Sequence, residues 1–139
     1  MSTIRVVQMG GLVSYTAVLA ASQAATAGKF GYFSDDNSVT PVSDADGAAQ
    51  LGKCVFMETL ASADADRHVN GRVVNVLVGG KGVVKTDYVE SEDEPVVGTR
   101  VYCNNSGKFC KTSTNNVDVG SCLAGEDGEG LYTIALLIP

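Results

Sequence analysis

The sequence contains a single histidine and no tryptophan in its 139 residues. One histidine leaves little room for acid–base or nucleophilic chemistry, which needs a second group held beside the first. Ten Lys and Arg stand against sixteen Asp and Glu, a formal net charge of −6, so the chain lacks the positive charge with which proteins hold nucleic-acid phosphates. No apolar run approaches the roughly 20 residues of a membrane span, and the longest, at residues 134–138, has the length of a buried strand.

Sequence motifs of common catalytic and metal sites are missing as well. There is no Gly-x-Ser-x-Gly elbow, no Cys-x-x-Cys pair and no EF-hand spacing of acidic residues. His68 follows Asp64 and Asp66, but nothing in the sequence places a nucleophile beside it. Those two acids, or the acids at 126, 127 and 129, are candidates for calcium ligands, and we favour solvated acidic loops for both. We therefore expect no enzyme activity, no cofactor and no metal.

The number of cysteines is even, which permits disulfides in an oxidising compartment. Each cysteine lies in an apolar or strand-like stretch, and free cysteine is among the most frequently buried residue types. We favour four free, buried thiols, with disulfides as the alternative. The four residues are Cys54, Cys103, Cys110 and Cys122.

The N-terminal segment, residues 1–27, differs from the rest of the chain. Residues 17–27 hold six alanines and no charge. They favour either a short helix that ends at Gly28 or an extended arm that packs on a neighbour. Residues 1–27 also resemble a signal peptide, but Ser14 and Thr16 interrupt the apolar part, so we expect the segment to be retained. We treat residues 1–27 as an arm.

Residues 28–139 show the pattern of an all-β domain, with short β-branched runs between glycine-rich and acidic turns. Residues 51–60 predict a central strand, with Cys54 and Phe56 on one face and Val55 and Met57 on the other. The rest predicts a single-domain antiparallel sandwich or barrel of eight to ten strands. Three hairpins are expected: 71–78 with 83–89, 96–103 with 108–112, and 117–124 with 131–138.

The second of these hairpins allows a prediction of register. Asn104-Asn105-Ser106-Gly107 suits a type I turn with Gly107 in the left-handed position. That turn sets Tyr102 opposite Cys110 and Cys103 opposite Phe109. Cys103 and Cys110 then lie on opposite faces, which argues against a disulfide between them.

Several short phrases give the chain a resemblance to a known family. They combine glycine with small or β-branched residues and spread over most of the chain. They are Gly10-Gly11-Leu12-Val13-Ser14-Tyr15-Thr16-Ala17, Ala27-Gly28-Lys29-Phe30-Gly31, Gln50-Leu51-Gly52-Lys53-Cys54-Val55, Asn70-Gly71-Arg72-Val73-Val74-Asn75-Val76, Val97-Gly98-Thr99-Arg100-Val101-Tyr102 and Val119-Gly120-Ser121-Cys122-Leu123-Ala124. In these phrases the sequence resembles the small decoration, or cement, proteins of tailed-bacteriophage heads, in particular a group of phage structural proteins that share a domain of unknown function.

The resemblance implies a non-enzymatic virion protein on the exterior of the capsid. Its partners would be the major capsid protein and further copies of itself, as a homotrimer, with no nucleic acid and no membrane. Alternatives are a head-fibre base, a tail adaptor or, from another class, a carbohydrate-binding β-domain. We expect the contacts with capsid and neighbouring subunits to come from the apolar arm, at Ile4, Val6, Val7, Leu12, Val13, Tyr15, Val18 and Leu19.

Overall fold

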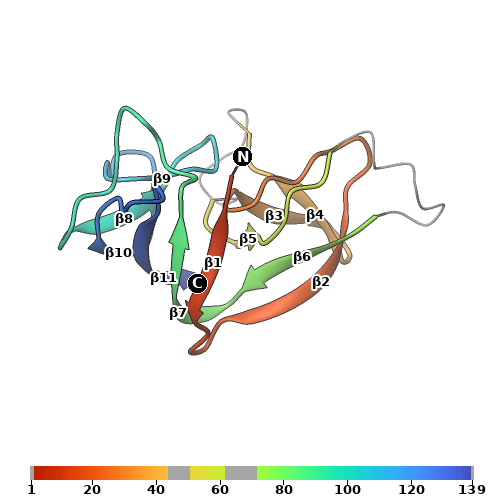
Figure 1. Cartoon of the computed structure of the whole chain (residues 1–139). Coiled ribbons are helices and arrows are strands. Elements are labelled where there is room, and N and C mark those ends of the chain that lie inside the picture. Colours follow the sequence, from red (N-terminus) through yellow and green to blue (C-terminus); the bar gives the residue numbers. More distant parts are fainter. Residues whose placement is uncertain (1, 44–50, 62–71, 139) are drawn as a thin grey trace.

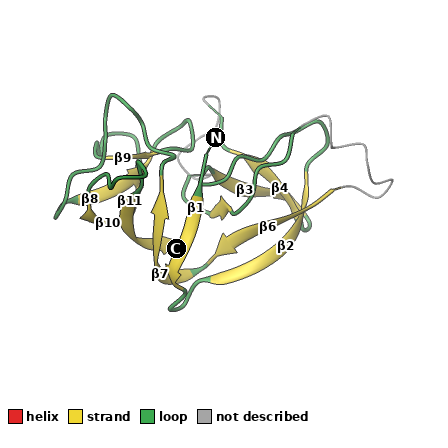
Figure 2. Cartoon of the chain, in the orientation of Figure 1, coloured by secondary structure: helices red, strands yellow, loops and turns green. Residues whose placement is uncertain are grey.

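The structure, a computed structural model, describes residues 2–43, 51–61 and 72–138. Within these ranges the chain forms strands and loops and no helix (Figure 2). This confirms the all-β prediction, with more strands than the eight to ten expected. The strands are β1 (Ile4–Gln8), β2 (Val13–Leu19), β3 (Phe30–Asp35), β4 (Ser38–Pro41), β5 (Cys54–Phe56), β6 (Arg72–Val78), β7 (Gly80–Thr86), β8 (Arg100–Cys103), β9 (Phe109–Cys110), β10 (Val117–Ala124) and β11 (Tyr132–Ile138).

The strands build two layers of different kinds (Figure 1). One is a six-stranded sheet in the order β1-β7-β11-β10-β8-β9, and the other is a small closed barrel in the order β2-β4-β3-β5-β6. Neighbouring strands are antiparallel except for a short parallel pairing between β2 and β4. The fold therefore combines the predicted barrel with an open sheet packed against it.

Two hydrophobic cores hold these layers. The larger core lies between sheet and barrel and includes Phe30 and Phe109, whose ring centroids are 4.8 Å apart. The smaller core fills the barrel. Strand β5 serves both, because Val55 belongs to the larger core while Cys54 and Phe56 point into the barrel. This confirms the prediction of a strand buried on both faces, although β5 is shorter than the predicted 51–60.

A bent two-stranded ribbon connects the layers. β1 pairs with β7 in the sheet, and their continuations β2 and β6 pair in the barrel. Gln8 lies opposite Val83 on the sheet side and Val13 lies opposite Val78 on the barrel side. The two pairs are five positions apart on each strand, with four residues between them, so the register continues through the bend. Figure 1 shows both strands turning together at the lower edge of the molecule.

Glycines make the bend possible, because the two backbones touch there. Gly11 N–H donates to the carbonyl of Lys81 at 2.7 Å. A Cβ on Gly80 would lie 2.2 Å from the Gly11 oxygen, and one on Gly10 would lie 2.4 Å from the Lys81 oxygen. Both glycines also have positive φ, a backbone conformation that is unfavourable for residues with a Cβ atom. This bend, which we call the corner, therefore requires glycine for two reasons: a Cβ atom would clash with the facing backbone, and the backbone conformation favours glycine.

The expected N-terminal arm was wrong as a description of residues 1–27. β1 is an edge strand of the sheet and β2 is a wall of the barrel. The predicted helix in residues 17–27 is also absent from this described stretch, since Ala25 instead pairs with Leu60 as an isolated bridge. The physical reason is that the apolar side chains of this segment find their partners within the chain, in the two cores.

The predicted hairpin of residues 71–78 with 83–89 was wrong too. β6 pairs with β2 and β5, whereas β7 pairs with β1 and β11. Gly79-Gly80-Lys81-Gly82 therefore bends one long strand from barrel to sheet instead of reversing it. The predicted strand at 96–103 is shorter, because residues 96–99 form a turn before β8.

The two hairpins near the C-terminus are confirmed. β10 and β11 pair as predicted, and β8 pairs with β9 with Tyr102 opposite Cys110 and Cys103 opposite Phe109. Gly107 has a φ of 75°, the left-handed conformation that the turn requires. The register of the β8–β9 hairpin could be predicted because it depends on the residues of its turn, which are read directly from the sequence.

All four cysteines are free and buried, as favoured from the sequence. Burial raises the pKa of Cys54 and of Cys103 from 9.0 to about 12, because the charged thiolate loses its hydration in the interior. Burial also raises the pKa of Cys110, to about 11. These thiols are small core side chains, and the protein environment disfavours their reactive form.

The raised thiol pKa values predict a loss of stability at alkaline pH. In the unfolded chain the thiols ionise near pH 9, while in the folded chain Cys54 and Cys103 stay protonated to about 12. The folded state then binds more protons, so the free energy of unfolding falls as pH rises from 9 through 12. Urea titrations at several pH values measure this slope. The double variant Cys54→Ala/Cys103→Ala is expected to show a shallower slope, and equal slopes would contradict the assignment.

Candidate docking surface

The open end of the barrel carries three exposed apolar side chains, Val13, Tyr15 and Phe33, beside the half-buried Val78 and the exposed Asn37. Tyr15 and Val13 come from β2, Phe33 from β3 and Val78 from β6, and Asn37 lies in the turn between β3 and β4. We call these five residues the barrel-mouth surface. Tyr15, Phe33, Asn37 and Val78 line a hollow of about 270 Å³.

Strand alternation explains why aromatic rings lie at this end. Residues directly opposite each other on neighbouring strands point to the same face. Tyr15 lies opposite Val76, and Phe33 lies opposite Val39. Val76 and Val39 are fully buried inside the barrel. Tyr15 and Phe33 therefore continue the barrel interior outwards to the point where nothing in the described chain covers it.

The two rings are held in place by contacts with each other and with the turn. Their centroids are 6.0 Å apart at an angle of 67°, an edge-to-face arrangement. The Tyr15 hydroxyl donates to the Asn37 side-chain oxygen. Asn37 is itself fixed, because its carbonyl accepts from Val18 N–H at 2.8 Å and its φ is 56°. The surface is therefore preorganised, which lowers the entropy cost of binding a partner.

The eight contact residues expected from the sequence fall into three groups in the structure. Leu12 and Leu19 are buried in the two cores, so their side chains do not reach a partner, and their assignment was wrong. The reason is that apolar residues at alternate positions look alike in sequence whether they face the core or the solvent. Ile4, Val6 and Val18 are partly buried, whereas Val7, Val13 and Tyr15 are exposed.

The sequence interpretation missed Phe33, Asn37 and Val78. Each lies in another part of the chain, and only the pairing of strands brings it beside Tyr15. One local signal was present: Phe33 stands directly before the polar run Ser34-Asp35-Asp36-Asn37, where a solvent-exposed turn is expected.

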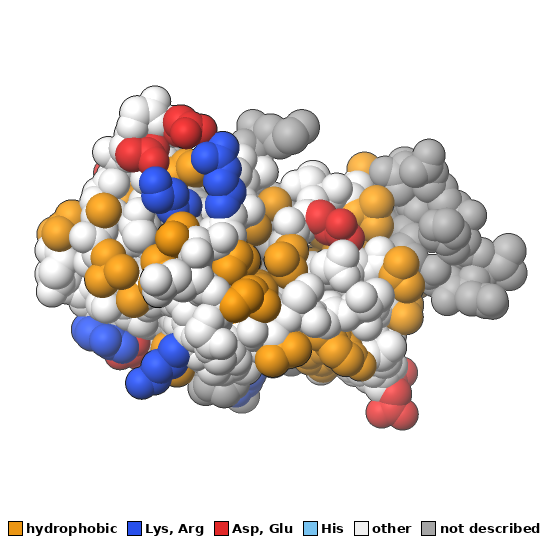
Figure 3. Space-filling view, turned by 60° about the horizontal axis from the view of Figure 1, so that its bottom comes forward, with side chains coloured by type: hydrophobic (Ala, Val, Ile, Leu, Met, Phe, Trp, Pro, Cys, Tyr) orange, Lys and Arg blue, Asp and Glu red, His pale blue; other side chains and the backbone are white. Residues whose placement is uncertain are grey.

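Lys and Arg side chains on the lower face gather on the sheet half of the molecule (Figure 3). Figure 3 looks at the lower face and shows Lys and Arg side chains over the sheet, with hydrophobic groups across the middle and over the barrel. Three ion pairs of the sheet are Arg5–Glu129 at 2.9 Å, Lys85–Asp127 at 3.4 Å and Arg100–Asp118 at 2.6 Å. These pairs are solvent-exposed, so each adds little stability.

The acidic loop between β10 and β11 acts as a structural connection. The Asp127 carboxylate accepts from the backbone N–H groups of Leu131 and Glu129. These two bonds, followed by Lys85, lower the pKa of Asp127. No group of three His, Cys, Asp or Glu side chains that would hold a metal ion occurs in residues 2–43, 51–61 and 72–138. His68, Asp64 and Asp66 lie outside the described residues.

Neither a scan against protein-family models nor a search of the curated proteins found a match to this chain. In the part of the chain that the structure describes, no helix has the length and apolar character to cross a membrane.

Proposed function

We propose that this chain is a non-enzymatic structural protein of a phage virion, which docks on the outer surface of the head and ties neighbouring major capsid proteins together. The observation that carries the proposal is the barrel-mouth surface. It presents preorganised aromatic and aliphatic side chains without a charged group among its five residues. Exposed apolar surface of this kind marks protein contact sites, and the resemblance to decoration proteins supplies the class of partner.

The composition of the surface fits docking by shape. Tyrosine and phenylalanine are enriched at the centres of protein interfaces, where a few such residues supply most of the binding free energy. Tyr15 adds a hydroxyl that is already satisfied by Asn37, so its ring is buried by a partner without leaving an unpaired polar group. A protein that touches several capsid subunits gains further affinity through multivalency.

The fold supports a load-carrying role between subunits. The bent ribbon from Ile4–Gln8 and Val13–Leu19 runs through both layers, and the barrel is closed. A force applied at the barrel mouth therefore reaches the sheet along paired backbone. This rigidity suits a protein that acts by holding its neighbours in place.

Changing the barrel mouth is expected to abolish attachment while leaving the fold intact. The double variant Val13→Asp/Phe33→Ser places a charge and a small polar group on exposed positions. Loss of two central apolar contacts lowers affinity for undecorated shells by roughly 30-fold or more. Co-sedimentation of purified protein with shells that lack it measures the affinity.

The matched control is Val73→Asp, which makes the same kind of change on the outer wall of the barrel, where Val73 is the most exposed large apolar residue. This variant is expected to bind like the unchanged chain. Equal binding by the Val13→Asp/Phe33→Ser variant would show that the barrel mouth is not the docking surface. A failure of the unchanged chain to bind shells would overturn the proposed function itself.

A further inference from the structure

One side of β2 has no partner strand where β2 passes the barrel mouth. β2 pairs with β6 along its whole length, from Val13 to Leu19, but with β4 only at Val18 and Leu19. The barrel is therefore closed on this side by a short pairing at one end of β2. Before that pairing β2 runs past the tip of the β3–β4 hairpin, and residues 13–16 are all exposed.

Strand alternation identifies the backbone groups on the unpaired side of β2. In a strand, the N–H and C=O groups of every second residue point to the same side. Val18 N–H points towards β4, because it donates to the Asn37 carbonyl at 2.8 Å. Ser14 and Thr16 share this side, and their backbone groups have no hydrogen-bond partner there within the described residues. We call the backbone of residues 14–16 the open edge.

The open edge adjoins the hollow of the barrel mouth. Tyr15 lies in the middle of the open edge, and its ring lines the hollow of about 270 Å³ together with Phe33 and Val78. A row of backbone donors and acceptors thus lies beside an apolar space. A bound strand uses both features, because its backbone bonds to the edge and its alternate side chains enter pockets.

Docking at the barrel mouth would bury the open edge together with the aromatic rings. A backbone group that loses water without gaining a hydrogen bond costs about 1–3 kcal/mol, and nearly all buried backbone groups in proteins are therefore paired. Ser14 and Thr16 present their N–H and C=O groups at the spacing of a strand. An extended backbone satisfies these groups in a single register, whereas the backbone of a helix is already bonded internally.

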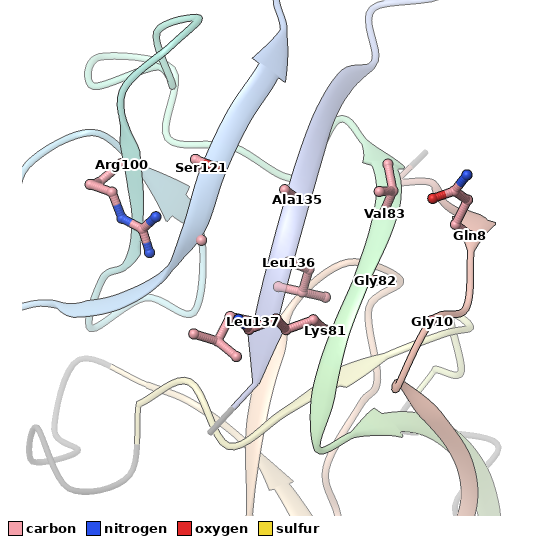
Figure 4. Close-up of a pocket in the computed structure, with 11 residues that line it drawn as sticks. Gln8, Gly10, Lys81, Gly82, Val83, Arg100, Ser121, Ala135, Leu136 and Leu137 are labelled. Carbon is pink, nitrogen blue, oxygen red and sulfur yellow. The ribbon is translucent and has the colours of Figure 1, made fainter.

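A larger hollow on the sheet lacks this combination. It measures about 440 Å³ and lies over β7, β10 and β11, where Figure 4 shows Val83, Ser121 and Ala135 on neighbouring strands. Each of these strands is already paired on both sides. The guanidinium of Arg100, at the border of the hollow, is engaged by Asp118 at 2.6 Å. The larger hollow therefore offers no backbone groups to an incoming strand.

The charge beside the open edge favours a basic partner segment. Asp35 and Asp36 are exposed in the turn that carries Asn37, whose side chain accepts from the Tyr15 hydroxyl. Among the described residues, neither of these carboxylates makes an ion pair. A segment with lysine or arginine beside its apolar residues gains attraction at this turn, whereas an acidic segment is repelled.

We propose that the open edge accepts an extended segment of the capsid protein as an added strand, which combines apolar side chains for the hollow with lysine or arginine for the acidic turn. This inference rests on the proposed function, which supplies the capsid protein as the partner. It goes further by stating how the partner binds. Main-chain hydrogen bonds to Ser14 and Thr16 hold the segment, and the hollow selects its apolar side chains.

Hydrogen exchange of the chain, free and bound to shells that lack it, tests this mode of binding. In the free chain we expect rapid exchange at the amides of Ser14 and Thr16, and slow exchange at Tyr15, whose amide faces β6. Binding is expected to slow exchange at Ser14 and Thr16 by about tenfold or more. Mass spectrometry with fragmentation to single residues measures these rates. Unchanged exchange at both amides in the bound chain would overturn the proposal.

Thr16→Pro is expected to lower affinity for shells by roughly tenfold or more, because proline removes a donor and its ring blocks the added strand. The fold should persist, since proline is tolerated where a strand N–H faces solvent. Asn105→Pro is the matched control, because it places proline at the first corner of an exposed turn, where proline is favoured. This control is expected to bind like the unchanged chain. Ser14→Pro replaces Thr16→Pro if the latter shows no cooperative thermal transition.

Co-sedimentation of these variants with shells separates the inference from the proposed function. Suppose that the unchanged chain binds, that Val13→Asp/Phe33→Ser does not, and that Thr16→Pro binds like the unchanged chain. The barrel mouth then docks through side chains alone, and the added strand is refuted while the proposed function stands. If the unchanged chain does not bind shells, the proposed function is refuted and the added strand with it.

Discussion

Gly80→Ala is expected to destabilise the folded protein by about 3–5 kcal/mol, placing it among the most damaging single substitutions. The added Cβ would lie 2.2 Å from the Gly11 carbonyl oxygen, a backbone atom that has no freedom to rotate away. The φ of Gly80 is 85°, which adds conformational strain for alanine. Relief of the overlap requires the two strands of the bent ribbon to separate where they pass from sheet to barrel.

The neighbouring residue supplies the control for this prediction. Gly79 also has a positive φ, of 52°, but a Cβ there meets no atom within 4 Å. Gly79→Ala should therefore lower the free energy of unfolding only through the strain of its positive φ, by about 1 kcal/mol. Urea unfolding of the two variants measures the difference directly. Equal destabilisation of both variants would mean that the close approach of Gly80 to Gly11 does not hold the corner.

Deletion of residues 2–19 is expected to abolish folding altogether. The deletion removes β1 from the sheet and β2 from the barrel, so the barrel no longer closes. It also removes Leu12 and Leu19 from the cores. Loss of two buried leucine side chains alone costs about 4–10 kcal/mol, which is comparable with the whole stability of a domain, about 5–15 kcal/mol.

Near-ultraviolet circular dichroism and a thermal scan measure the effect of the deletion. The truncated chain is expected to show no cooperative transition. As a control, Val7→Ser/Val13→Ser changes exposed side chains of the same segment and keeps both strands. This variant should melt like the unchanged chain. A truncated chain that melts cooperatively would restore the earlier interpretation of residues 1–27 as a separable arm.

The local parts of the fold could be predicted from the sequence. The β8–β9 hairpin followed from the chemistry of its turn, with Gly107 in a conformation that glycine favours. The β5 strand followed from apolar residues on both faces, which only a strand between two cores presents. In both cases the determining interactions lie within a few residues in the chain.

The bend between barrel and sheet and the barrel-mouth surface could not be predicted from residues that are close together in the chain. A glycine-rich run marks a change of direction, but the choice between a reversal and a bend depends on Gly10 and Gly11, some 70 residues earlier in the chain. Tyr15 was identified because its segment is apolar. Phe33 was not, because only the closure of the barrel brings it to the same end.

Electron cryomicroscopy of phage particles whose genome encodes this chain tests the central claim most directly. The account predicts density for this β-fold on the exterior of the head, with the end of the barrel that carries Tyr15 and Phe33 facing the capsid subunits. Mature particles that lack this density, or that hold it inside the head, would contradict the account.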